Sequence, residues 1–182
     1  MRRRLLVHGV DDNSRSADTF CDERLQYLDI RYWTNVPIPD TYAASVISLY
    51  LTTDHPTVAL FDAELFIGDL VSKAHRFCSS LLVNTVLCYQ IEGLHFAYRD
   101  GEAVADLARQ QCYSICEPAA GSLGLAFYLE ANRLWNIERG NVSLLNLAAS
   151  QLMAHVCASN GMDKDGARYR SVCRELYMQL YK

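Results

Sequence analysis

The sequence lacks most of the patterns that point directly to a chemical function. It contains no phosphate-binding GxGxxG or GxxxxGK[ST] motif, and no two of its cysteines have the CxxC spacing typical of structural zinc sites. No apolar run approaches the ~20 residues that a transmembrane helix needs. The opening stretch MRRRLLVHGV also has too short an apolar part for a secretory signal. We therefore expect no membrane span and no secretion.

Positive charge is scarce as well. The formal net charge is −4, and arginines cluster only at the start of the chain, in MRRR. A domain that binds nucleic acid usually presents a basic stripe along one face. The charge balance therefore predicts no direct nucleic-acid binding by this chain.

The composition that remains is typical of one folded domain, or of part of a larger one. The 182 residues are 51% hydrophobic and 21% charged, as in globular proteins. The seven cysteines are odd in number and lie mostly in apolar helical patterns. This usage indicates reduced, buried thiols in the cytosol or the nucleus. The cysteines are Cys21, Cys78, Cys88, Cys112, Cys116, Cys157 and Cys173.

Apolar residues recur at helical spacing through most of the chain, and no comparable strand-type alternation occurs. We predict an all-α fold, an irregular bundle of about six to seven helices. Residues 1–32 are polar and weakly patterned, and we expect them to be a linker or a disordered segment, with at most a short helix at 20–30. Residues 33–182 would form the helical domain. The predicted helices span residues 40–53, 62–73, 81–98, 100–117, 122–138, 143–160 and 163–181.

Two of these helices carry informative details. Asp62 is a good N-cap, and Phe61 and Phe66 are spaced for a hydrophobic staple across the start of the second helix. The helix at 81–98 is apolar round most of its circumference, which predicts that other helices surround it.

The first helix is expected to be amphipathic. Asp40 or Thr41 can cap its N-terminus, because both side chains accept hydrogen bonds from free backbone N–H groups. Ser45, Ser48 and Thr52 then fall on one side, which we assign to solvent. For the fifth helix, Gly140 is the expected C-terminal stop.

The last helix has the clearest apolar stripe, and the stripe continues to the end of the sequence. The sixth helix can cover part of it. We expect a protein partner, or further helices of a domain that is incomplete at its C-terminus, to pack on Tyr169, Val172, Leu176 and Leu180. A homodimer is one form that such a contact can take.

The candidate catalytic and metal-binding residues favour structural interpretations. Cys112 and Cys116 share a helix face, but no second Cys/His pair completes a zinc site, so buried thiols are favoured. No other pair has the orienting group or oxyanion site that catalysis needs. We predict no catalytic, cofactor-binding or metal-binding residue, and no enzyme. The other pairs are His155 with Cys157, His75 with Cys78, and Glu92 with His95.

A series of short motifs between residues 33 and 84 is specific enough to suggest a family. A second set at residues 127–152 follows the same pattern. The motifs are Trp33-Thr34 with Val36, Ile47-Ser48-Leu49-Tyr50-Leu51, Asp54-His55-Pro56, Phe61-Asp62, Glu64-Leu65-Phe66, Asp69-Leu70, Arg76-Phe77-Cys78-Ser79 with Leu82-Val83-Asn84, Phe127-Tyr128, Glu130-Ala131, Arg133-Leu134-Trp135 and Ser143-Leu144 with residues 148–152.

These motifs resemble the N-terminal part of the fungal transcription factor regulatory domain, the middle homology region of binuclear zinc-cluster regulators. The resemblance implies a nuclear regulator of transcription, and without it we would place the chain in the cytoplasm. It also implies an N-terminal cluster of six cysteines that holds two zinc ions and binds DNA. This chain has only Cys21 before Trp33, so no zinc ligand and no cofactor can be assigned to it.

The sequence therefore predicts a regulatory helical domain without its own DNA-binding cluster. Its expected work is intramolecular inhibition, effector sensing or partner binding. The alternative is a standalone helical module for protein–protein interaction or dimerisation.

Overall fold

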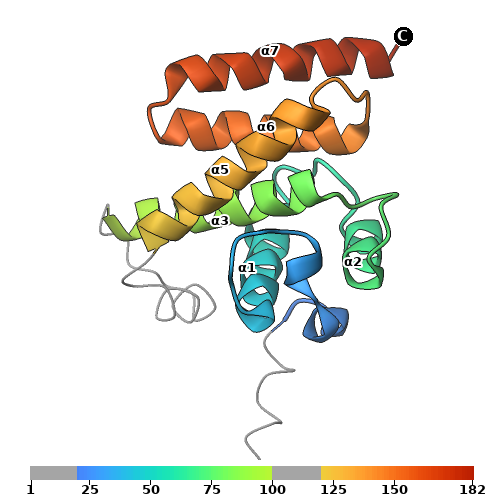
Figure 1. Ribbon diagram of the computed structural model, residues 1–182, viewed down its shortest axis with the longest axis vertical. Helices are drawn as coiled ribbons and strands as arrows, with labels where there is room; N and C mark the ends of the chain where they lie inside the picture. Colours follow the sequence, from blue (N-terminus) through green and yellow to red (C-terminus); the bar gives the residue numbers. More distant parts are fainter. Residues whose placement is uncertain (1–19, 100–119) are drawn as a thin grey trace, which may run out of the picture.

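The computed structural model describes residues 20–99 and 120–182, and within these ranges every element of regular secondary structure is a helix, with no strand. The all-α prediction is confirmed (Figure 1). The helix expected at 100–117, with Cys112 and Cys116, lies outside the described residues. The elements are η3 (Glu23–Tyr27), η4 (Ile30–Tyr32), α1 (Asp40–Thr53), α2 (Ala63–Ser72), α3 (Ser80–Arg99), α5 (Ala120–Glu138), α6 (Leu144–Ser159) and α7 (Asp163–Leu180), where η marks a 3₁₀ helix.

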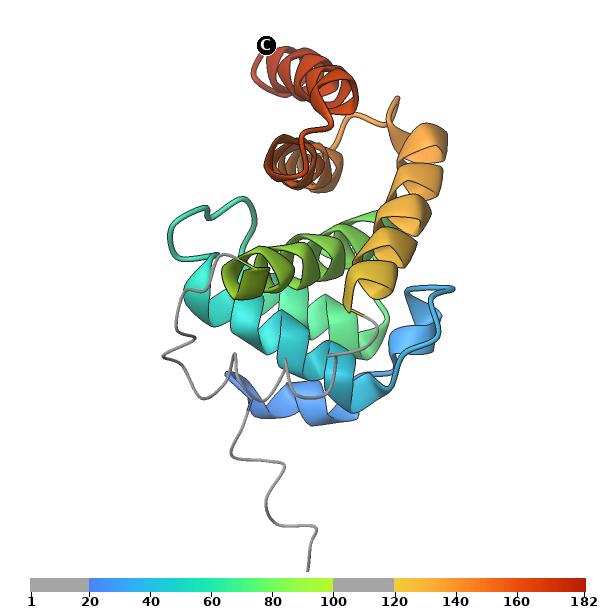
Figure 2. The same ribbon diagram turned by 90° about the vertical axis from the view of Figure 1, so that its left-hand side faces the viewer.

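The helix α3 lies in the middle of the described part of the chain, as the sequence predicts. It packs against α1 on one side and against α5 and α6 on the other (Figures 1 and 2). Every residue from 81 to 88 is buried. A helix with apolar residues all round can be stable only in such surroundings, because each face must leave water.

The packed part of the chain begins before Trp33. Leu25, Leu28 and Ile30, which we expected in a linker, are buried in the core, and η3 packs on α1 and α2. For residues 20–32 the linker prediction is therefore wrong. The reason is that the two 3₁₀ turns are too short to give a periodic signal, although they bring their few apolar side chains to one side.

The first helix is buried on more sides than its pattern indicates. Its N-cap is Pro39, because the carboxylate of Asp40 instead accepts the backbone N–H of Ile30 at 3.0 Å. The hydroxyl of Ser48 faces the protein and accepts the backbone N–H of Cys21 at 2.6 Å. The expected cap and the expected solvent side at Ser48 are both wrong, since the segment before α1 covers that face.

The second helix begins as its sequence predicts. The carboxylate of Asp62 accepts the backbone N–H of Leu65 at 2.9 Å, so it is the N-cap. The rings of Phe61 and Phe66 pack with their centroids 4.8 Å apart across this start, which confirms the staple. The helix ends at Lys73, whose φ of 60° is left-handed.

A buried polar junction joins η4, α2 and α3. The indole of Trp33 donates to the carbonyl of Leu70 at 2.9 Å. The amide of Asn84 donates to the carbonyl of Trp33 at 2.9 Å, and its oxygen accepts the hydroxyl of Thr34 at 2.6 Å. Every one of these groups is buried, so the bonds replace water that the interior excludes.

The turn between α5 and α6 is closed by a side chain and not by a glycine. The amide of Asn146 donates to the carbonyls of Glu138 and Asn141 at 2.7 and 3.0 Å. These bonds satisfy carbonyls that the end of α5 leaves open. Gly140 was the expected stop, but among the described residues the glycine with a positive φ is Gly161, at 66°, just after α6.

None of the helices in the described ranges combines the length and the apolar composition needed to cross a bilayer.

Candidate interaction surface

The inner face of α7 is covered by the chain itself. Tyr169 and Leu176 are 1% and 3% exposed, and α7 packs along α6. The hydroxyl of Tyr169 donates to Asn132 of α5 at 2.9 Å, and its ring lies 4.6 Å from that of Trp135. The sixth helix therefore covers part of the stripe, as expected. A partner cannot pack on Tyr169 or Leu176 unless α7 first moves.

The stripe remains open toward its end. Val172 and Leu180 are half-buried, whereas Tyr177 and Tyr181 are 53% and 66% exposed. The two tyrosine rings lie side by side with centroids 4.7 Å apart. Exposed neighbouring aromatic rings of this kind are typical of contact surfaces.

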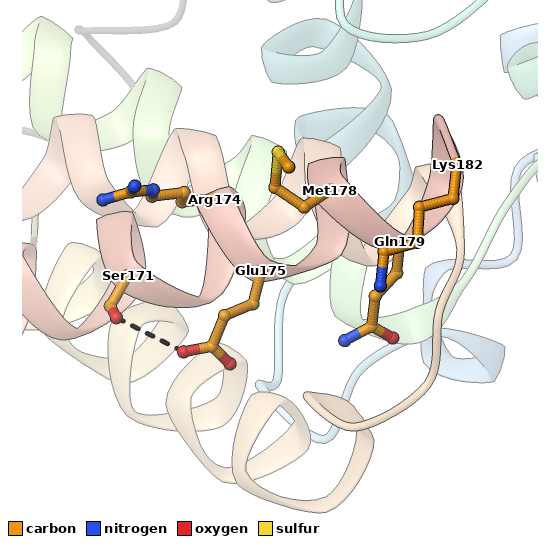
Figure 3. A pocket seen from close by; sticks show the side chains of 6 residues that line it. All are labelled: Ser171, Arg174, Glu175, Met178, Gln179 and Lys182. Atoms are coloured by element: carbon orange, nitrogen blue, oxygen red, sulfur yellow. Dashed lines mark hydrogen bonds between the residues drawn. The ribbon is translucent and has the colours of Figure 1, made fainter.

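The outer side of α7 adds Met178, which is 56% exposed. Figure 3 shows its side chain beside those of Ser171, Arg174 and Glu175 along one side of the helix. The residues that line this shallow hollow come from α7 and from Lys182 just after it, so no other helix of the described part of the chain forms an opposite wall. The sequence pattern did not single out Met178, since it lies outside the apolar stripe.

A second exposed apolar strip lies on α5. Leu125 and Leu129 are 54% and 57% exposed and one helical turn apart, so they share a face. Near the end of the same helix, Ile137 is 69% exposed. Single exposed apolar residues are common, but two on one face give a partner somewhere to bind.

The His/Cys pairs considered from the sequence do not form reactive couples. Nε2 of His75 lies 2.8 Å from the hydroxyl of Tyr32 at the surface, whereas Cys78 is fully buried. Burial raises the pKa of the Cys78 thiol, so the thiolate needed for nucleophilic attack is disfavoured.

The second pair is divided between the two sides of α6. His155 is exposed and lies 3.0 Å from the amide of Gln151. Cys157 faces inward, with its sulfur 3.9 Å from the hydroxyl of Tyr128. Burial raises the pKa of Cys157 too. These positions support the structural interpretation that the sequence favours.

The Glu92/His95 pair can be placed only in part, because the side chain of His95 lies outside the described residues. Glu92 lies half-buried where α3 crosses α5, against Gly124. Cβ of any larger residue at Gly124 would overlap the Glu92 carboxylate and lie 2.9 Å from its Cδ. Among the described residues, no group of three or more His, Cys, Asp or Glu side chains is arranged to hold a metal ion.

Sequence reasoning did not find a small polar network between α5, α6 and α7. The hydroxyl of Tyr128 lies 3.5 Å from the carboxylate of Asp165 and also contacts Cys157. Burial, followed by the nearby Cys157, raises the pKa of Tyr128, so its hydroxyl stays protonated and can donate. No sequence signal marks this network, because its members lie on three different helices.

The described residues thus define an all-helical protein with exposed apolar side chains on α5 and α7. Comparison with curated proteins finds a fungal relative. A stretch of 117 residues, 62% of this chain, is 30% identical to the notoamide biosynthesis transcriptional activator notL' of Aspergillus versicolor. The match covers 15% of that protein, so this chain spans a small part of the relative's length. No family model matches the chain, and no solved structure does so either.

This similarity supports a relationship between the chain and fungal transcription factors.

Proposed function

We propose that this chain is a regulatory helical domain of a fungal zinc-cluster transcription factor, and that it acts through protein contacts without a DNA-binding cluster of its own. The observation that carries the proposal is the similarity to a fungal transcriptional activator. The motif series from Trp33 to Asn84 supports the more specific assignment to the middle homology region. On this proposal the chain works in the nucleus, catalyses no reaction and needs no cofactor of its own.

The structure gives such a domain the means for association. Tyr177, Met178 and Tyr181 on α7, and Leu125 and Leu129 on α5, are apolar side chains held at the surface by well-packed helices. These exposed groups equally favour the second candidate function, a standalone module for protein–protein interaction or dimerisation.

A reporter assay tests the regulatory role. The full chain is fused to an unrelated DNA-binding domain, and expression is measured from a promoter that carries the matching sites. We expect expression to rise or fall relative to the DNA-binding domain alone. No change in either direction would contradict a regulatory domain.

Two matched variants identify the surface that acts. One fusion carries Tyr177→Ser with Tyr181→Ser, and the other carries Leu125→Ser with Leu129→Ser. All four residues are exposed, so we expect both variants to keep the helical circular dichroism spectrum. Loss of the effect in one variant only would assign regulation to that helix.

A second assay tests the absence of DNA reading. The unfused chain is mixed with a fluorescent library of DNA duplexes at physiological salt. We expect no sequence-specific retention, because a net charge of −4 provides little phosphate neutralisation. Tight, sequence-specific binding would contradict the proposal.

A further inference from the structure

The outer side of α7 faces away from the rest of the described chain. Its residues recur at alternating steps of three and four, so they share one face of the helix. All of them are exposed. They are Lys164, Ala167, Ser171, Arg174 and Met178.

The sizes of these side chains differ between the two halves of the helix. Ser171 is small and lies in the first half, whereas Met178 is large and lies in the second. Two copies in antiparallel orientation can place Met178 of each opposite Ser171 of the other. Such alternation of large and small residues is how helix surfaces interlock.

The charges at the middle of the helix have the same self-complementarity. Arg174 and Glu175 are adjacent and of opposite sign, and Arg174 has no ion-pair partner among the described residues. Glu175 accepts only a long 3.5 Å contact from the hydroxyl of Ser171 (Figure 3). Both charged groups are therefore available to a partner.

We propose that α7 pairs, antiparallel and about a two-fold axis, with α7 of a second copy of this chain. An axis that sets Arg174 opposite Glu175 of the second copy also sets Ser171 opposite Met178 of that copy. Two-fold symmetry repeats each contact, so one sequence supplies two ion pairs and two size-matched contacts. The second helix provides the wall that the hollow in Figure 3 lacks.

The charges select the antiparallel orientation. In a parallel pair, each arginine or lysine of the outer side would face its own copy, so that Lys164 met Lys164 and Arg174 met Arg174. Like charges facing each other across an interface disfavour association. The antiparallel pair avoids both contacts.

The inference does not depend on a role in transcription, and a separate measurement tests it. A contact made by one helix of each copy is small, and we expect a weak dimer with a Kd of about 10–100 µM. Sedimentation of the full chain between about 1 and 300 µM should show a monomer that passes into a discrete dimer. A monomer throughout, or a larger oligomer, would overturn the inference.

Charge reversal tests the geometry. In the dimer, Arg174→Glu places two glutamates opposite each other at each of the two symmetric contacts, and Glu175→Arg does the same with two arginines. Each variant should raise the Kd of the dimer about tenfold or more. The double variant Arg174→Glu with Glu175→Arg restores both ion pairs in reversed order. Its Kd should return to within about threefold of the unaltered chain.

The matched control is Arg31→Glu, which changes the same charge at an exposed position of η4, far from α7 (Figure 1). Its dimer should be unaffected, and circular dichroism should show that all four variants keep their helices. A dimer that tolerates both single reversals, or one that the double variant fails to restore, would place the contact elsewhere and overturn the inference.

Discussion

Asn84 joins α3 to the segment before α1 through one buried amide. Its side chain bonds the carbonyl of Trp33 and the hydroxyl of Thr34, and it also donates to the carbonyl of Ser80 in its own helix at 2.8 Å. A buried polar group that loses its partner costs more than the bond contributed, because no water can replace the partner. Asn84 therefore stabilises the fold mainly by satisfying the hydrogen bonds of the buried groups around it.

We expect Asn84→Ala to lower the free energy of unfolding by about 2–4 kcal/mol, since it leaves the Thr34 hydroxyl without an acceptor and the Trp33 carbonyl without its side-chain donor in the interior. Urea denaturation followed by circular dichroism measures the change. The control is Asn35→Ala, which removes an exposed amide that donates to Glu130 at 2.8 Å. That change should cost less than about 1 kcal/mol. Equal costs for the two variants would contradict this account of Asn84.

The hydrogen bonds of individual buried residues are also what the sequence predicts least well. Asn84 is one of the few polar residues of α3, but its partners Trp33 and Thr34 are about 50 residues away in the chain. Ser48 was assigned to solvent for the same reason, because the segment that covers it carries no periodic signal. Local patterns report which side chains are polar, and only tertiary packing decides which of these are buried.

At the scale of helices, Gly124 leaves room for the Glu92 side chain where α3 and α5 cross. The backbone of α5 approaches Glu92 so closely that a methyl group at Gly124 would overlap the carboxylate. The thiol of Cys88 also lies here, 3.8 Å from the carbonyl of Gly124. The absence of a side chain at Gly124 thus leaves the space that the Glu92 carboxylate occupies.

We expect Gly124→Ala to lower the free energy of unfolding by about 1–2 kcal/mol, because Glu92 must move to make room. In a chain that already carries Glu92→Ala, the same change should be neutral or stabilising, since alanine favours a helix over glycine by about 1 kcal/mol. A double-mutant cycle by urea denaturation measures this coupling. If the cost were the same in both backgrounds, the clash with Glu92 would not be its cause.

Most helix boundaries could be predicted, and the reason is that their signals are local. The N-cap Asp62 and the staple of Phe61 and Phe66 act within a few residues, and both occur as expected. Ser143 caps α6 in the same local way, because its hydroxyl accepts the backbone N–H of Asn146. The prediction that Gly140 ends the fifth helix failed because the carbonyls at the end of α5 are satisfied by Asn146, a residue of the next helix. For the contact surface, the stripe on α7 was visible in the sequence, but which of its residues α6 covers was not.

At the scale of the whole molecule, buried thiols make stability depend on alkaline pH. Burial raises the pKa of Cys78 and Cys88, and it raises that of Cys173 from 9.0 to about 11. Between the two pKa values of such a thiol, the folded state binds more protons than the unfolded state. Stability that is fully present below pH 9 is therefore lost as pH rises through this range.

We expect the free energy of unfolding to fall progressively above about pH 9, by up to about 1.4 kcal/mol per pH unit for each such thiol. Urea titrations at a series of pH values measure the slope. Cys78→Ala should be less stable overall but show a shallower decline above pH 9. Its slope between pH 6 and 8 should be unchanged and serves as the control. An unaltered alkaline slope would show that Cys78 does not contribute.

The central position of α3 also has a consequence for synthesis. Ribosomes make the N-terminal part first, so α1 and α2 are present when α3 emerges, whereas α5 and α6 are not. About 60 residues separate the end of α3 at Arg99 from the end of α6 at Ser159. At about 5–20 residues per second, the side of α3 that faces α5 and α6 stays uncovered for about 3–12 seconds. During that time the nascent chain presents an apolar helix to chaperones and to neighbouring chains.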